Sequence, residues 1–267
     1  MKVAGSATRR LRPNTIEGGT DMSATAYFEK AIETLQKVID SEREHISQAA
    51  DMLVDAITGG ASIFSFGASH SFMMTEELVY RTGGLMLVNP IYPHGMNLFV
   101  RPMTATSRME RVPGLGAEML ASSPAKEGDV LIITSTSGRN AVVIDMAIAA
   151  REQGIKTIGI TALEYTKGVG SRHPSGKKLA DLCDVVIDNG APYGDAAVEF
   201  SSFPQKVGPL SSVTGCAIVN ALVADVVDRL VKKGINPPVF MSANLDGGDE
   251  YNNRLLAENK HRIYYME

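Results

Sequence analysis

The residues best suited to chemistry in this chain are four consecutive hydroxyl side chains at positions 134–137. They follow an apolar run at 130–133, and after Gly-Arg-Asn at 138–140 a helical pattern covers 141–153. The first N–H groups of a helix are unpaired and partly positive, so they attract anions, and short hydroxyls add further donors. The pattern therefore predicts a phosphate site. A nucleotide P-loop needs Lys after its second glycine, so a small phosphorylated metabolite is favoured over a nucleoside triphosphate.

Plain helix capping is the competing interpretation, because Ser, Thr and Asn are the usual N-cap residues. A cap uses one hydroxyl, however, and this segment offers four. A junction of the same kind occurs earlier. There, an apolar run at 62–66 leads through Gly-Ala-Ser-His-Ser at 67–71 into a helical pattern that reaches Arg81. Two such junctions suggest two sides of one binding site.

Short apolar runs alternate with helical stretches along most of the chain, and these elements must position the junctions. Strands are expected at 62–66, 85–88, 130–133, 157–161 and 184–187. Such alternation predicts an α/β fold with parallel strands and helices on both faces. Ligands of these sheets bind beyond the carboxyl ends of the strands, which is where both hydroxyl-rich junctions fall.

Two long helices are expected outside this alternation. One runs from Ala24 to the glycine pair at 59–60 and is longer than covering a sheet requires, so part of it is expected to pack on a partner subunit. The other covers 211–233 and is apolar on nearly every side, which predicts burial within the subunit or in a dimer interface. A polar, Gly-rich loop at 242–249 precedes a last helix.

Composition limits the classes of function. The chain has 267 residues, 44% of them hydrophobic and 21% charged, which is ordinary for a globular protein. A net charge of -4 argues against a nucleic-acid binder that works by charge. Neither a membrane span nor a secretory signal is recognisable, so a cytoplasmic protein is expected. Residues 1–21 lack periodicity and are interpreted as a disordered lead or a non-native start, with a single domain at 22–267.

The two junctions together resemble the sugar isomerase (SIS) domain family over about residues 24–234. That family includes phosphoheptose isomerases, the isomerase half of glucosamine-6-phosphate synthase, N-acetylmuramic acid 6-phosphate etherases and sugar-phosphate-sensing transcription regulators. Pro-His-Gly-Met-Asn at 93–97, His-Pro-Ser-Gly at 173–176 and Asp-Gly-Gly-Asp at 246–249 make the chain similar to single-domain SIS proteins described as phosphosugar-binding proteins or phosphoheptose isomerases.

The resemblance implies a flavodoxin-like parallel sheet flanked by helices on both faces, which pairs into homodimers or homotetramers. It also implies that five residues hold the substrate phosphate: Ser69, Ser135, Thr136, Ser137 and Asn140. Asn140 stands where many relatives carry Ser or Thr, and its amide can still donate. The hydroxyl-rich start of the 211–233 helix resembles the segment that closes the sugar site in relatives, which makes Ser211, Ser212 and Thr214 candidate substrate contacts.

Isomerisation of an aldose to a ketose moves a proton between C1 and C2, so a carboxylate is needed near C2. Relatives place a catalytic Glu in a run similar to Thr-Glu-Glu-Leu at 75–78. Glu76 and Glu77 point about 100° apart on a helix, so only one can face the site. Glu77 is favoured, because it lies two turns beyond Ser69 and places Leu78 inward. Two solvated surface acids are the alternative.

A second acid–base group is expected among three histidines on loops, whose ordinary pKa is close to neutral. His70 belongs to the first junction, His94 lies between a proline and a glycine, and His173 lies in a Gly- and Ser-rich loop at 168–176 that could act as a lid. Each could instead be a structural, hydrogen-bonded histidine. The histidines lack zinc-motif spacing, so neither a metal nor another cofactor is implied.

The sequence thus predicts binding of a sugar phosphate and leaves three functions open. The first is an isomerase that interconverts aldose and ketose phosphates, with Glu77 as the base. The second is a dehydratase or lyase acting on an amino-sugar 6-phosphate, which uses the same base but expels a substituent at C3. The third is a non-catalytic phosphosugar sensor. Against the third, the sequence shows no helix-turn-helix domain to report the signal.

Overall fold

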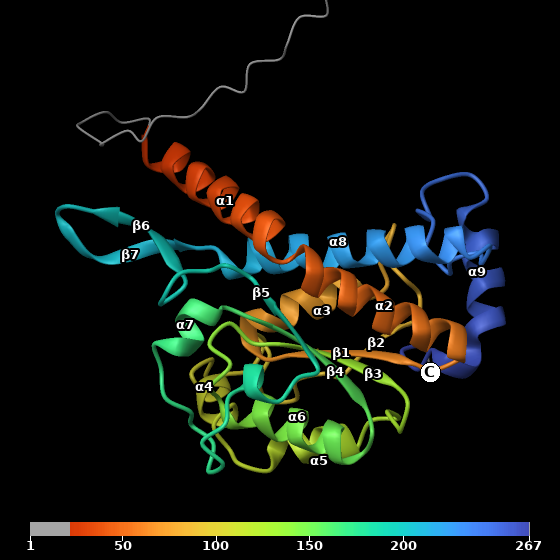
Figure 1. Cartoon of the computed structure of the whole chain (residues 1–267), viewed down its shortest axis with the longest axis horizontal. Helices are drawn as coiled ribbons and strands as arrows, with labels where there is room; N and C mark the ends of the chain where they lie inside the picture. Colours follow the sequence, from red (N-terminus) through yellow and green to blue (C-terminus); the bar gives the residue numbers. More distant parts are fainter. Residues whose placement is uncertain (1–21, 267) are drawn as a thin grey trace, which may run out of the picture.

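Five parallel strands form the centre of the molecule in the computed structural model, which describes residues 22–266 (Figure 1). The predicted lead at residues 1–21 lies outside the described residues. The strands stand side by side in the order β2-β1-β3-β4-β5. Their bounds are β1 (Ile63–Gly67), β2 (Val88–Pro90), β3 (Val130–Thr134), β4 (Lys156–Thr161) and β5 (Val185–Asp188). This is the flavodoxin-like order, with its topological switch point between β1 and β3.

Helices cover both faces of this sheet, as the sequence predicts. Alternate strand residues serve opposite faces, so Ile63 and Ile132 belong to one core cluster and Phe64 and Ile133 to the other. The first cluster is closed by α2 (Arg43–Gly59), α3 (Phe72–Leu78) and α8 (Ser211–Lys232), and the second by α5 (Leu115–Ala121) and α6 (Ala141–Glu152). Figure 1 shows the two groups above and below the strands.

The prediction of one long N-terminal helix is wrong, because the helix breaks at Glu42 into α1 (Met22–Ser41) and α2. The cause is a buried carboxylate. Glu42 is 5% exposed, and it accepts hydrogen bonds from the Ser41 hydroxyl and, over 3.1 Å, from the backbone N–H of Asp188 at the end of β5. His45 also contacts this carboxylate, at 2.8 Å. The chain therefore turns where a side chain must reach the sheet.

The start of one strand and the end of one helix differ from the boundaries expected from the sequence. The strand expected at 85–88 begins only at Val88, because Leu85 forms an isolated bridge with Val239 and Met86 N–H donates to the Pro238 carbonyl. The helix expected to reach Arg81 ends at Leu78. Burial rather than regular structure explains the apolar pattern of the first segment, since residues 85–88 are all buried.

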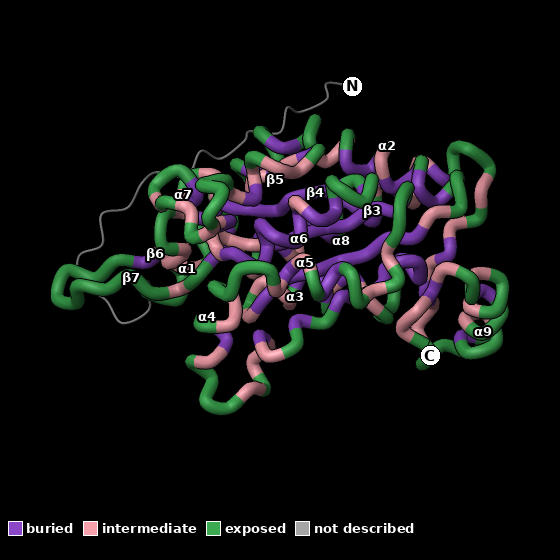
Figure 2. Tube along the Cα trace, turned by 90° about the horizontal axis from the view of Figure 1, so that it is seen from below, coloured by how far each residue is buried: buried purple, intermediate pink, exposed green. Residues whose placement is uncertain are grey.

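The remaining elements lie around this core: α4 (Ala105–Met109), α7 (Leu163–Lys167), β6 (Ala196–Phe200), β7 (Phe203–Pro209), α9 (Gly248–Asn259) and the 3-10 turns η1 (Ser69–Ser71), η2 (Leu179–Asp181) and η3 (Lys260–Arg262). The antiparallel β6–β7 hairpin was not predicted. It projects beside α1 and is largely exposed (Figures 1 and 2). Helix α8 is buried on one side only, because Val213 and Val231 are exposed.

Candidate functional site

Both hydroxyl-rich junctions lie at the carboxyl ends of neighbouring strands. β1 and β3 pair in parallel with Gly67 opposite Thr134, so the segments that follow them leave the sheet side by side. The strand order reverses at this point, and open α/β sheets bind ligands in the crevice that the reversal creates. The fold thus brings Ser69 and the segment 135–140 to one place, as the sequence analysis expected.

The turn after β1 is sterically tight. A Cβ added at Gly67 would lie 2.3 Å from the carbonyl oxygen of Ser71, so this position needs glycine. Ser69 has a φ of 52°, a conformation that non-glycine residues rarely adopt, and its N–H donates to the Met96 carbonyl over 2.8 Å. Strained residues of this kind persist where the surroundings hold them, often at ligand sites. The tight turn therefore fixes Ser69 just beyond the carboxyl end of β1.

We call the segment 135–140 the phosphate loop. The Ser135 hydroxyl oxygen accepts a bond from Gly138 N–H over 3.2 Å, which leaves its own proton available to donate. Among the residues that the structure describes, the Thr136 and Ser137 hydroxyls have no hydrogen-bond partner, and all three side chains are partly exposed. Hydroxyls that only capped α6 would be bonded to its backbone. These are instead available to a ligand.

Asn140 is the N-cap residue of α6, yet its side chain makes no capping bond. Its amide Nδ2 donates to Glu110 Oε2 over 2.7 Å, and its Oδ1 accepts from Arg172 Nη1 over 3.0 Å. The amide is therefore used for contacts across the site and not for the helix. This observation weakens the interpretation of the segment as plain capping.

Glu110 completes the site and was not predicted from the sequence. Its Oε1 accepts from the Ser69 hydroxyl over 2.7 Å while its Oε2 holds Asn140, so one carboxylate joins both junctions. Its backbone carbonyl also accepts Val142 N–H over 3.1 Å, in the first turn of α6. Nothing in the connection between β2 and β3 marks Glu110 in sequence, because its role depends on contacts 30 and 41 residues away.

Three arginines lie next to Glu110 or Asn140, two of them in sequence and one by contact. Arg111 follows Glu110 in the chain, and Arg139 precedes Asn140. The side chain of Arg172 donates to Asn140, and its backbone N–H donates to the Arg139 carbonyl over 2.8 Å. Desolvation, together with the positive charges of Arg139 and Arg111, lowers the pKa of Arg172. The Nε of Arg139 is buried and has no partner in the described part of the chain. Positive charge is therefore concentrated around Arg172.

Glu77 occupies a different position from the phosphate loop. It lies on α3 facing α8, where its carboxylate accepts from Asn220 Nδ2 over 2.6 Å and pairs with Arg81. Leu78 is buried and Glu76 is exposed, as the helix argument expected. No contact within residues 22–266 joins Glu77 to the phosphate loop, so its role as the base stays a prediction.

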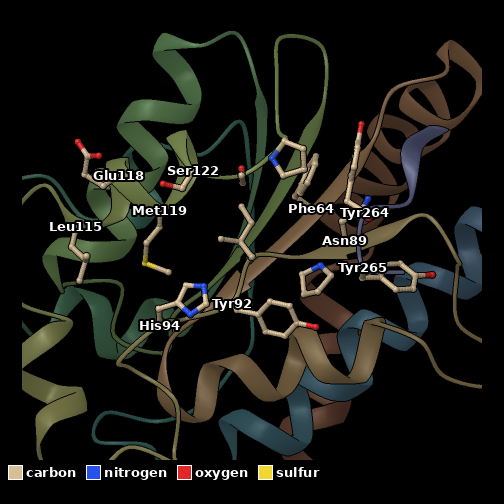
Figure 3. A pocket seen from close by; sticks show the side chains of 14 residues that line it. Phe64, Asn89, Tyr92, His94, Leu115, Glu118, Met119, Ser122, Tyr264 and Tyr265 are labelled. Carbon is tan, nitrogen blue, oxygen red and sulfur yellow. Dashed lines mark hydrogen bonds between the residues drawn. The ribbon is translucent and has the colours of Figure 1, made fainter. Parts of the chain in front are cut away.

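The three loop histidines do not converge. His94 lines a cleft of about 420 Å³ beside β2, where Figure 3 shows it near Tyr92, Leu115 and Met119. The His94 loop adjoins the site through Met96, whose carbonyl holds Ser69. His70 is exposed on the η1 turn, within the first junction.

His173 is anchored and is not free on a mobile lid. Its Nε2 contacts Asp145 Oδ1 at 2.9 Å, and the other oxygen of Asp145 accepts Gly114 N–H over 2.7 Å. Its Nδ1 contacts the Ser175 hydroxyl at 2.7 Å. This arrangement ties the 171–178 loop to α6, one residue beyond Arg172. His173 therefore helps to position that arginine, and a direct catalytic role stays a prediction.

The hydroxyls at the start of α8 are already engaged. The Ser211 hydroxyl donates to Asp195 Oδ2 over 2.7 Å, and the Thr214 hydroxyl donates to the Leu210 carbonyl over 3.1 Å. Both residues are buried, whereas Ser212 is partly exposed. Contact of these three residues with substrate stays a prediction. Within residues 22–266, no three His, Cys, Asp or Glu side chains are grouped as metal ligands, and no helix is long and apolar enough to cross a membrane.

Comparison with known proteins identifies the class of this fold and site. A family model described as SIS domain matches residues 26–162, a range that holds both junctions, Glu77, His94 and Glu110. The chain therefore belongs to the SIS domain family. Within it, the chain is 46% identical over 240 residues to a UPF0309 protein of Shouchella clausii, a match that covers 90% of this chain and 98% of the relative. It is also 42% identical over 243 residues to a UPF0309 protein of Streptomyces griseus, which covers 91% and 97%.

Solved structures share the fold at lower identity. A phosphoheptose isomerase from Francisella tularensis superposes with a TM-score of 0.51 at 15% identity, covering 76% of this chain and 95% of that one. The Vibrio vulnificus NanR protein complexed with ManNAc-6P gives 0.52 at 15% identity, covering 90% and 70%. These likenesses confirm the SIS fold predicted from the two junctions.

Proposed function

We propose that this chain binds a sugar phosphate at the β1/β3 crevice and catalyses enolisation of the sugar, as an aldose–ketose isomerase does. One observation carries the binding half of the proposal. The Thr136 and Ser137 hydroxyls, which lack partners among the described residues, precede Asn140, which links the Glu110 carboxylate to Arg172 at the start of α6. Helix N-termini, hydroxyls and arginines are the groups that proteins use for phosphate.

The fold relatives support the choice of ligand. One of them is a phosphoheptose isomerase, and another was solved in complex with ManNAc-6P. We infer that the phosphate of the substrate binds to Ser69, Ser135, Thr136, Ser137 and Asn140, with Arg172 close enough to add charge. The sugar would then extend from the crevice toward whichever residues carry the proton-transfer step.

For that step we propose Glu77 as the base at C2. Asn220 and Arg81 fix its carboxylate, which gives a positioned acceptor at the α3–α8 contact. His94 and His173 are proposed for proton transfer at the sugar oxygens, with His94 the more accessible of the two because it is exposed. An enediol route needs both kinds of group, one at carbon and one at oxygen.

The test is incubation of the protein with hexose, heptose and N-acetylamino-sugar phosphates in heavy water, followed by proton NMR. We expect loss of the C2 proton signal and growth of the isomer for at least one of them. A new alkene product would select the dehydratase or lyase in place of the isomerase. Binding without exchange would select the sensor, and no binding at all would contradict the proposal.

A further inference from the structure

The Glu110 carboxylate accepts hydrogen bonds from two of the residues that we assign to the phosphate. The hydroxyl of Ser69 and the amide of Asn140 come from two different strand ends, and each donates over 2.7 Å to this one side chain. Both were predicted as phosphate donors from their positions in the sequence. A carboxylate presents two acceptor oxygens and one negative charge, so it is the closest internal substitute for a bound oxyanion.

The surroundings favour an anion at this point more strongly than Glu110 alone requires. The site lies at the N-terminus of the 12-residue helix α6, where negative charge is stabilised. Arg111, Arg139 and Arg172 lie next to Glu110 or Asn140, and the buried Nε of Arg139 lacks a partner in the described residues. Arg172 therefore brings positive charge to Asn140, and the charges of Arg139 and Arg111 lie close enough to act on Arg172.

We propose that Glu110 is an exchangeable internal anion, which binds the Ser69 and Asn140 donors until the phosphate of the ligand displaces it. The inference rests on the proposed function and adds a specificity-determining residue to it. A phosphate monoester carries a charge of about -1.5 to -2 and three acceptor oxygens, so it can replace a carboxylate at these donors. A ligand with a single carboxylate offers no more than Glu110 does, and it is rejected.

The exchange needs only a side-chain movement. The backbone carbonyl of Glu110 accepts Val142 N–H independently of the carboxylate, so the chain stays attached to α6 when the side chain swings out. Glu110 is only partly buried, and it directly follows α4, in a connection whose residues 101–104 are exposed. Solvent can therefore receive the displaced carboxylate.

The test is calorimetric titration of the full chain and its Glu110→Gln variant with inorganic phosphate and with fructose 6-phosphate. Removing the charge removes both competition and repulsion, so we expect Glu110→Gln to bind each probe about tenfold more tightly or better. Glu110→Ala should change in the same direction. Glu152→Gln removes an equal charge from the opposite end of α6 and should bind as the wild type does. A purely structural role for Glu110 predicts the reverse, so unchanged or weaker binding in both Glu110 variants would overturn the exchange.

A further variant separates this inference from the proposed function. Ser135→Ala combined with Ser137→Ala is introduced into the wild type and into Glu110→Gln. If the two serine substitutions leave phosphate affinity unchanged in both backgrounds, the proposed site is wrong, and the proposed exchange is wrong with it. If binding depends on the serines but Glu110→Gln does not strengthen it, only the exchange is wrong.

Discussion

At the scale of residues, the position of segment 135–140 between a strand and a helix could be predicted because its signal is local. A strand, four hydroxyls and a helix start follow one another in sequence, and the structure leaves the Thr136 and Ser137 hydroxyls without partners in the described chain. Glu110 could not be predicted in this way. It reaches Ser69 and Asn140 only after the chain has folded, and an isolated Glu beside a short helix has no distinguishing pattern.

Glu77 is the residue on which the proposed chemistry depends. Glu77→Gln keeps the shape of the side chain and its contact with Asn220, so ligand affinity should change little while C2 proton exchange is abolished, because an amide cannot take the proton. Proton NMR in heavy water and calorimetry on the same sample separate the two effects. Glu76→Gln is the matched control, since that residue is exposed on another face of α3.

The ranking of these two variants decides the assignment. A larger loss of exchange in Glu76→Gln would move the base to that residue. Small and equal effects would exclude the α3 carboxylates as the base and would direct attention to His94, His173 and Glu199.

At the scale of elements, the strands were predicted within one residue or so except where tertiary contacts compete. The run at 85–88 is apolar because Leu85 and Met86 pack against the segment near Val239, and only its end joins the sheet. The break between α1 and α2 at Glu42 also has a tertiary cause, because the Glu42 carboxylate accepts a hydrogen bond from the backbone N–H of Asp188, 146 residues away. The β6–β7 hairpin gave no clear signal, because turn-forming residues surround its short strands.

The turn after β1 supplies a prediction at this scale. Gly67→Ala would place a methyl group against the Ser71 carbonyl, so the turn must shift, and we expect a loss of about 1–3 kcal/mol in the free energy of unfolding. Denaturant titration measures it. Gly170→Ala is the control, because a Cβ there meets nothing within 4 Å. Equal stability of the two variants would show that the turn is not as tight as described.

At the scale of the whole molecule, α1 and the β6–β7 hairpin extend from one end of the sheet (Figure 1). Phe28, Ile32 and Ile39 are 65%, 62% and 48% exposed, and helical spacing places them on one face of α1. Phe203 and Val207 of the hairpin are exposed as well. A monomer would leave this apolar surface in water, so we propose that a second copy of the chain covers it, in line with the homodimer or homotetramer expected from sequence.

The oligomer gives a prediction of its own. Ile32→Glu should lower the mass measured by light scattering during size-exclusion chromatography, because it places a charge in the proposed apolar contact. Lys37→Gln changes the net charge by the same amount on the polar side of α1 and should leave the mass unchanged. A wild-type mass equal to one chain would contradict the proposal.

Calorimetric titration of the Ser135→Ala, Ser137→Ala double variant with sugar phosphates tests the central claim most directly. The two hydroxyls should contribute about 3–6 kcal/mol, if each bond to a charged group is worth about 1.5–3 kcal/mol, so affinity should fall by at least about a hundredfold. The fold should be intact, and a Ser201→Ala, Ser202→Ala variant at the exposed hairpin tip should bind normally. Unchanged affinity for phosphorylated sugars in the first variant would show that the phosphate is not bound at the β1/β3 crevice.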